Sequence, residues 1–187
     1  RSIVDEKSVD RDLVDLIWFP TGGGKTEAYL GLTAFTIFYR RMKYKTGSSG
    51  TTVIMRYTLR LLAAQQFTRA STLICACEYI RKESKNRISI YKKYDIGNDC
   101  ITIGLWIGNK HTPNKNKDAN KNLKDLTDSN KGDLRYRKDR FNKFQVLKCP
   151  WCGTKMVKDV KGKAEVGQWG YKMRNNAHFY MSCPQEE

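Results

Sequence analysis

The chain has 187 residues, of which 40% are hydrophobic, and it carries a formal net charge of +16 at pH 7. This length allows one domain of ordinary size, or a smaller domain with an appendage, and the hydrophobic fraction can bury a core. The charge indicates a polyanionic partner, and the absence of any apolar run of bilayer length excludes a transmembrane protein and a membrane partner.

The chain begins with Arg1 rather than Met, so we expect a piece excised or processed from a longer protein. Residues 1–12 are polar and are expected to form a frayed or helical lead-in. Residues 13–19 lack polar alternation, which predicts a short strand buried on both faces. Pro20 and three glycines end this strand, and a helical pattern opens at Lys25. The stretch therefore predicts a strand, a glycine loop and a helix start.

A loop of this kind is suited to a phosphate chain. Thr21, Gly22, Gly23, Gly24, Lys25 and Thr26 form it. Glycines let several backbone N–H groups converge on one anion, and the positive end of the following helix adds to their attraction. We expect Lys25 to reach the β- and γ-phosphates of ATP and the Thr26 hydroxyl to bind Mg²⁺. Phe19 stands where the strict motif has its first glycine, and superfamily 2 helicases relax that position.

Two more strands and two helices are predicted downstream. Apolar residues recur at helical spacing from Tyr29 to Met42, and a Gly/Ser break then precedes a second strand, 51–57. Thr58 is placed to cap an amphipathic helix that ends in the charged run 81–85. Residues 100–107 read as a third strand. This alternation predicts an α/β fold with a parallel sheet flanked by helices, here over residues 1–109.

The pattern fails over residues 110–143, where Asn and Lys dominate and apolar residues are isolated. We interpret this stretch as a basic, exposed insertion that is partly disordered. Residues 110–163 contain sixteen Lys or Arg residues and six Asp residues, and so carry +10 of the net charge. Nucleic acid is the natural partner of such a surface.

Residues 144–187 contain a candidate metal site. Cys149 and Cys152 have Cys-x2-Cys spacing, and Cys183 starts what looks like a second knuckle. Three thiolates leave a tetrahedral Zn²⁺ one ligand short. Either His178 completes the site or a fourth cysteine lies beyond Glu187. Six cysteines without a signal peptide predict a cytoplasmic location.

Four stretches carry a resemblance to a known family: FPTGGGKTEAYLGL, MRYTLRLLAAQQFTRA, GLWIGNKHTPN and LKCPWCGTKM. Together they resemble the N-terminal RecA-like region of superfamily 2 helicases of the DrmA family, which are helicase-like components of the bacterial DISARM antiphage systems. The resemblance implies a partial RecA-like P-loop domain with an inserted zinc ribbon. It also implies that Thr58, Arg60 and Thr112 face nucleic acid, DNA rather than RNA. Further partners would be the remainder of the helicase and other defence subunits.

The resemblance is incomplete in one respect. No Asp-Glu pair ends an apolar strand downstream of Thr26, so the Walker B carboxylates are absent, as is a second RecA-like domain. We therefore expect a fragment of an ATP-driven helicase or translocase that is inactive alone. The alternative is a nucleic-acid-binding module in which the zinc ribbon and basic loop act and the P-loop half is a scaffold. A P-loop ATPase or kinase unrelated to nucleic acid is disfavoured by the charge.

Overall fold

The structure is a computed structural model of the whole chain. It describes residues 3–14, 16, 18, 20, 22–45, 50–57, 60–86, 88–108, 111–160, 163–164, 166–174 and 177–185. The chain divides into two compact units. Unit 1 comprises Arg1–Leu59 and Arg69–Ile103, and unit 2 comprises Arg60–Thr68 and Gly104–Glu187. Each is described by itself.

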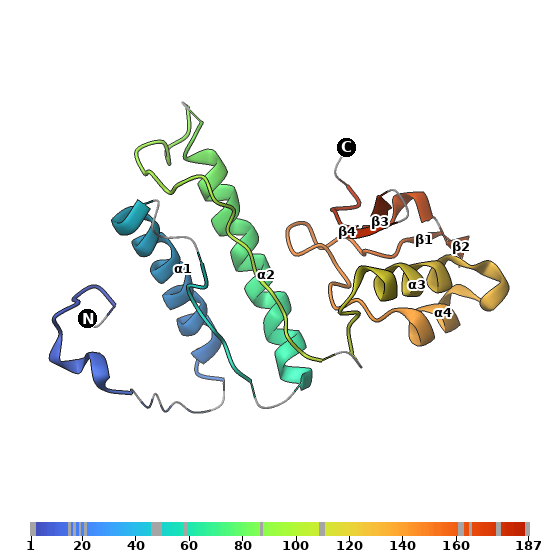
Figure 1. Cartoon of the computed structure of the whole chain (residues 1–187), viewed down its shortest axis with the longest axis horizontal. Coiled ribbons are helices and arrows are strands. Elements are labelled where there is room, and N and C mark those ends of the chain that lie inside the picture. Colours follow the sequence, from blue (N-terminus) through green and yellow to red (C-terminus); the bar gives the residue numbers. More distant parts are fainter. Residues whose placement is uncertain are drawn as a thin grey trace. The chain divides into compact units, whose positions relative to one another are not determined.

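Two long helices dominate the first half of the chain (Figure 1). After a short 3-10 turn, η1 (Val9–Asp12), helix α1 spans Lys25–Tyr44 and helix α2 spans Arg60–Glu83. Both helices lie where the sequence predicted them, although Tyr29, Leu32, Phe35 and Met42 of the predicted apolar stripe of α1 are exposed. In unit 1, Ile37 of α1 packs with Ile74 and Cys77 of α2 and with Ile101, which together form a small core.

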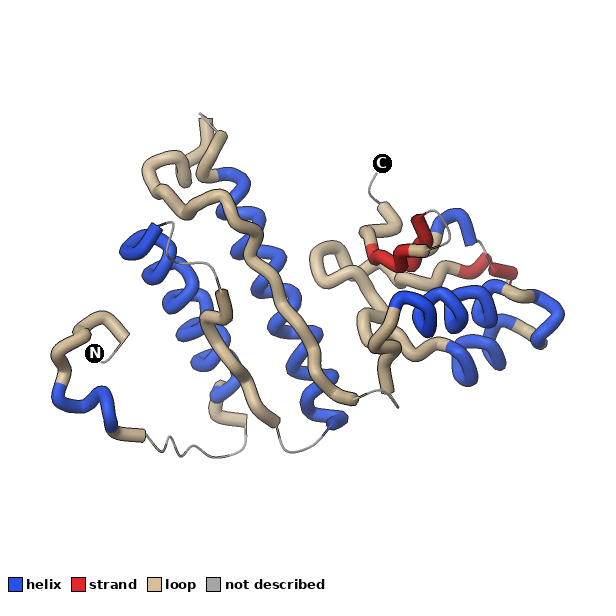
Figure 2. The backbone as a smooth tube through the Cα atoms, viewed as in Figure 1, coloured by secondary structure: helices blue, strands red, loops and turns tan. Residues whose placement is uncertain are grey.

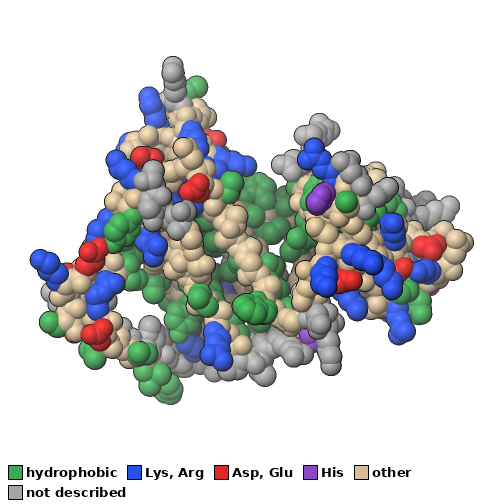
Figure 3. Space-filling model, in the orientation of Figure 1, with side chains coloured by type: hydrophobic (Ala, Val, Ile, Leu, Met, Phe, Trp, Pro, Cys, Tyr) green, Lys and Arg blue, Asp and Glu red, His purple; other side chains and the backbone are tan. Residues whose placement is uncertain are grey.

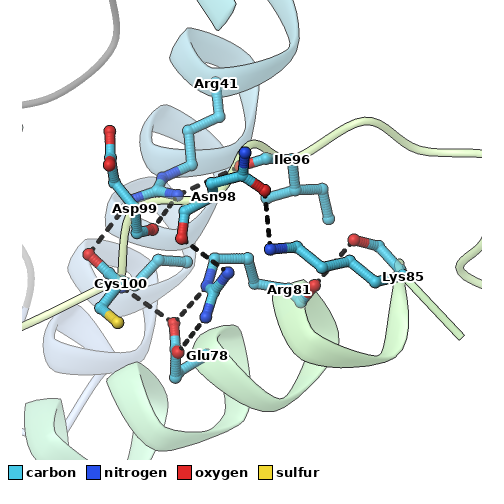
Figure 4. Close-up of polar contacts among 10 residues, drawn as sticks. Arg41, Glu78, Arg81, Lys85, Ile96, Asn98, Asp99 and Cys100 are labelled. Atoms are coloured by element: carbon cyan, nitrogen blue, oxygen red, sulfur yellow. Dashed lines mark hydrogen bonds and ion pairs between the residues drawn. The ribbon is translucent and has the colours of Figure 1, made fainter. Parts of the chain in front are cut away.

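Two buried arginines fasten residues 96–101 to the helices of unit 1 (Figure 4). Arg41 of α1 donates to the carbonyl oxygens of Ile96, Asp99 and Cys100 at 3.1, 2.6 and 3.3 Å. Arg81 of α2 donates to the Asn98 carbonyl at 3.0 Å. Because a guanidinium offers five donors in a planar fork, each arginine satisfies carbonyls that have no partner in a regular element. We call residues 96–101 with Arg41, Arg81 and Glu78 the arginine clamp.

The three predicted strands appear as loop segments in the described residues. Residues 51–57 and 100–108 carry no strand assignment, nor do residues 13, 14, 16 and 18 (Figure 2). A strand is defined by ladder hydrogen bonds to a neighbour, and none of these segments has one among the described residues. The parallel sheet and the RecA-like fold therefore stay predictions.

The stretch 110–143, expected to be a partly disordered insertion, contains two helices among its described residues. Helix α3 (Asn116–Thr127) and helix α4 (Leu134–Phe141) fill it, with a 3-10 turn η3 (Ser129–Lys131) between them. Isolated apolar residues 119, 123 and 126 have helical spacing and all point into the core. Arg137 of α4 is buried and donates to the Leu126 carbonyl at 2.7 Å, which joins the two helices.

Unit 2 has its own core, which is formed by helices α3 and α4 together with the cysteine-rich segment that follows them. Leu126 and Trp169 are both fully buried in it. The Phe144 ring stacks on Phe179, with 4.6 Å between centroids, and lies 4.5 Å from Tyr171. Two antiparallel pairs and a 3-10 turn complete the unit. They are β1 (Asp159–Val160) with β2 (Lys163–Ala164), η4 (Val166–Gln168), and β3 (Tyr171–Arg174) with β4 (His178–Met181).

Candidate phosphate loop and metal centre

The glycine loop has the backbone that an anion cradle needs. Gly22 and Gly24 lie in the left-handed region, with φ +89° and +76°, whereas Gly23 between them does not. Alternation of this kind turns successive N–H groups to one side, and only glycine adopts it without strain. Helix α1 begins at Lys25, immediately after Gly24, so its positive end faces the same loop. The predicted glycine turn and helix start are therefore present in the structure, and the phosphate site stays a prediction.

The side chain of Lys25 folds back over the loop. Its Nζ donates to the Pro20 carbonyl at 3.2 Å, and the Gly23 N–H donates to the same oxygen at 3.1 Å. The ammonium is therefore held beside the glycines, in a position from which it can exchange a carbonyl for a phosphate. Thr26 is half-buried one residue into α1. Thr21 lies outside the described residues.

The residues predicted to face nucleic acid are only partly described. Thr58 lies outside the described residues, and Arg60 is the first residue of α2. Thr112 is half-buried in a turn that follows residue 108. This turn is tied to unit 2, because Gln145 Nε2 donates to the His111 carbonyl at 2.7 Å. Arg60 and Thr112 belong to unit 2 and the glycine loop to unit 1.

The three cysteines converge as predicted. The Sγ atoms of Cys149, Cys152 and Cys183 all lie within 4.8 Å of one another, and those of Cys152 and Cys183 are 3.5 Å apart. Thiolates bound tetrahedrally to one zinc, each about 2.3 Å from it, lie about 3.8 Å apart. The cluster thus fits a metal such as zinc. A tight turn shapes it: the Cys149 N–H donates to the Thr154 carbonyl at 2.8 Å, and the Gly153 N–H donates to the Cys149 carbonyl at 2.9 Å.

One thiol of the cluster is prepared for ionisation. The Cys152 thiol donates to the Thr154 hydroxyl at 3.2 Å, and hydrogen bonding with the hydroxyl and the backbone N–H of Thr154 lowers the pKa of Cys152 to about 7. Metals bind the thiolate, so this bond favours loading at neutral pH. The Gln185 N–H lies 3.4 Å from Cys183 Sγ, a second backbone donor to the sulfurs.

His178 is not part of the cluster, and its proposed role as fourth ligand is wrong for the described residues. It opens β4 and pairs with Arg174 at the turn end of the hairpin, whereas Cys183 follows the other end. The extended strand from His178 to Met181 alone covers about 10 Å, too far for one coordination sphere. The alternative of a ligand beyond Glu187 stays a prediction.

The sequence analysis missed three features of unit 2. Thr154, which bonds Cys152, gives no motif signal. Trp151 within the Cys-x2-Cys pair is 58% exposed, and its position between two ligands could have marked it. The exposed lysines of α3, Lys117, Lys121 and Lys124, follow i, i+4, i+7 spacing, which would have been recognised had the helix been predicted.

Comparison with known proteins gives one informative similarity. The chain is 44% identical over 158 residues to the DISARM protein DrmA of Bacillus paralicheniformis. The match covers 82% of this chain and 13% of the length of that relative. No family model matches the chain. No solved structure matches it either. The chain is therefore related to a segment of DISARM protein DrmA.

Proposed function

We propose that this chain, a relative of DISARM protein DrmA, is part of an ATP-driven nucleic-acid helicase or translocase that acts in antiphage defence. The observation that carries the proposal is the left-handed pair Gly22 and Gly24 leading directly into α1. Left-handed glycines also occur in other turns of this chain, but here two of them within three residues lead directly into the start of a long helix, an arrangement suited to the β- and γ-phosphates of ATP. The similarity to DrmA supplies the defence context.

Each residue of the loop has a role in the proposal. The glycine N–H groups and the start of α1 hold the phosphates, and Lys25 replaces its bond to Pro20 with one to the β- or γ-phosphate. The Thr26 hydroxyl ligates Mg²⁺. In this proposal the loop belongs to a RecA-like sheet. The carboxylates and the second RecA-like domain needed for hydrolysis come from elsewhere in a longer protein.

Unit 2 provides the proposed nucleic-acid surface. Lys117, Lys121 and Lys124 form an exposed row on α3, and none of them makes an ion pair with another described residue. The opposite face of α3 is buried, so these lysines can point only outward. Figure 3 shows Lys and Arg side chains over the visible face of unit 2. Such a row suits a phosphodiester backbone, and in this proposal the nucleic acid is DNA.

Zinc has a structural role in the proposal. Cys149, Cys152 and Cys183 join the turn at 149–154 to the end of the β3–β4 hairpin, segments about 30 residues apart in sequence. One ion bound to all three would fix this corner of unit 2. A fourth ligand would come from outside the described cluster.

Nucleotide binding by the Lys25→Ala variant tests the phosphate loop. Loss of the ammonium should weaken binding of a fluorescent ATP analogue in the presence of Mg²⁺ by at least about tenfold, because charge-assisted bonds to phosphate are lost. Lys82→Ala, which removes an exposed lysine of α2, is the matched control and should bind as the wild type does. Equal affinity of Lys25→Ala and the wild type would contradict the proposal.

One observation favours a second candidate. Unit 2 has its own core and contains both the cysteine cluster and the lysine row. It can therefore act as a nucleic-acid-binding module while the glycine loop serves only as scaffold. ATP-analogue binding abolished by Lys25→Ala favours the motor, and an absence of nucleotide binding in the wild-type longer protein favours the module.

A further inference from the structure

Helix α1 starts at a residue that cannot cap it with a side chain. Its N-cap is Gly24, which has no side-chain oxygen to accept a hydrogen bond from the first turn. The first four N–H groups of an α-helix also have no partner inside the helix. In the proposed function, these groups and the N–H groups of the glycine loop bind the phosphates of ATP. Any other anion that reaches the helix start would therefore compete with the nucleotide.

One carboxylate of the chain is placed to be such a competitor. Glu27 is the third residue of α1 and the one acidic residue of its first turn. A glutamate at this position commonly turns back to the free N–H groups at the helix start, and the positive end of the helix attracts its charge. A carboxylate seated there would occupy N–H groups that the phosphates need and would repel the phosphates themselves.

The structure shows that the Glu27 carboxylate is held by a different group. Its Oε1 accepts a hydrogen bond from the guanidinium of Arg69 on helix α2, 42 residues further along the chain. Both residues belong to unit 1. Ala70 and Ser71, which follow Arg69, are buried, so the arginine projects from a packed part of α2. The pair therefore links the first turn of α1 to a fixed point on the neighbouring helix.

The stability of the fold gives little reason for this pair. The side chains of Arg69 and Glu27 are 46% and 62% exposed, and solvent screens such pairs. A comparable pair joins Lys43, in the last turn of α1, to Glu6, with side chains 36% and 55% exposed. The two pairs differ in their place on the helix. The Arg69 pair alone of the two involves the turn that follows the glycine loop.

We propose that Arg69 is a positioning residue for the phosphate loop, because it draws the Glu27 carboxylate away from the start of α1 and neutralises its charge. The inference rests on the proposed binding of ATP and adds to it a residue outside the loop. While the pair is formed, the N–H groups of the glycine loop and of the first turn stay open to phosphate. Once the arginine is removed, the carboxylate becomes an internal competitor of the nucleotide.

The test is the affinity of the full chain for a fluorescent ATP analogue in the presence of Mg²⁺. Arg69→Ala should weaken binding roughly three- to tenfold, because the freed carboxylate competes with phosphate at the helix start. Adding Glu27→Ala to Arg69→Ala should restore the wild-type affinity, since no carboxylate is then left to compete. Arg69→Lys keeps a cation opposite Glu27 and should retain most of the affinity.

The matched control is Lys43→Ala, which breaks the exposed pair with Glu6 at the other end of α1 and should bind as the wild type does. Unchanged affinity in Arg69→Ala, or an equal loss in Lys43→Ala, overturns the inference. A loss in Arg69→Ala that Glu27→Ala does not restore also overturns it, because Arg69 would then act on the nucleotide directly. Equal affinity of Lys25→Ala and the wild type would instead contradict the proposed function.

Discussion

Gly24 shows how a single residue prepares a binding loop. Its φ of +76° lies in the left-handed region, and an added Cβ would meet nothing within 4 Å. The need for glycine at this position is therefore conformational and not steric. Gly31, within α1, also has open space around an added Cβ but has no positive φ. Alanine at either position would meet no steric clash, but only at Gly24 would it strain the backbone.

Gly24→Ala should weaken binding of the ATP analogue, since a side chain disfavours the left-handed backbone by about 1 to 2 kcal/mol and the loop would relax out of its cradle. Gly31→Ala should leave binding unchanged and raise the free energy of unfolding by about 0.5 to 1 kcal/mol, because alanine is the better helix former. Nucleotide titration and denaturant unfolding measure the two effects. Equal affinity of Gly24→Ala and the wild type would mean that the glycine conformation does not matter for binding.

Residue types and spacing were enough to predict that Cys149, Cys152 and Cys183 converge, because Cys-x2-Cys spacing with a distant third cysteine is typical of a metal knuckle. The same reasoning offered His178 as a ligand and failed. Whether a residue lies near a cluster depends on the hairpin register, which pairs His178 with Arg174 and directs it away from the sulfurs. Phe179 of the same hairpin stacks on Phe144, a contact between segments far apart in sequence that no local pattern reveals.

The arginine clamp holds residues 96–101 to helices α1 and α2 through hydrogen bonds from charged side chains. Glu78 pairs with Arg81 and also accepts from the Ile101 N–H at 2.9 Å. The side chain of Arg81 is only 6% exposed and that of Glu78 only 18%. The Arg81 guanidinium lowers the pKa of Glu78 from 4.5 to about 2. The pair therefore contributes to folding only while the carboxylate is ionised.

The pH dependence of stability follows from the lowered pKa of Glu78. Since the pKa of Glu78 is lower in the folded than in the unfolded chain, its contribution is complete above pH 4.5 and is lost as the pH falls towards 2. Glu78→Gln should lower the free energy of unfolding at pH 7 by about 2 to 3 kcal/mol and flatten the acid limb of the profile. Denaturant unfolding between pH 2 and 7 measures both.

Glu27→Gln is the control for this prediction. Glu27 also pairs with an arginine, Arg69, but their side chains are 62% and 46% exposed, and solvent screens such pairs. We expect this variant to lie within 1 kcal/mol of the wild type. A loss for Glu27→Gln as large as that for Glu78→Gln would show that burial of the clamp does not set its contribution.

Helices could be predicted from the sequence where apolar residues recur at helical spacing over many residues. Helices α1 and α2 follow from their apolar spacing, whereas α3 went unrecognised because Lys and Asn fill most of its positions and only residues 119, 123 and 126 are apolar and buried. The stability of α3 comes from packing against α4 and β4, contacts between segments distant in sequence. Composition alone therefore gave no indication of the helices α3 and α4.

The two units of the chain have different tasks in the proposed function. Unit 1 contains the glycine loop and the arginine clamp, and unit 2 contains the cysteine cluster and the lysine row of α3. Among the described residues, no helix is long and apolar enough to cross a membrane. The central claim is that nucleotide binding and nucleic-acid binding depend on separate residues.

The most direct measurement of that claim is the salt dependence of duplex DNA affinity for three proteins: the wild type, Lys25→Ala, and a variant with Lys117, Lys121 and Lys124 changed to Gln. Each phosphate contact contributes about −0.9 to the slope of log affinity on log salt, so the triple variant should have a slope shallower by up to about 2.7. Lys25→Ala should keep the wild-type slope while losing the ATP analogue. A slope unchanged in the triple variant, or DNA binding lost together with nucleotide binding in Lys25→Ala, would contradict the account.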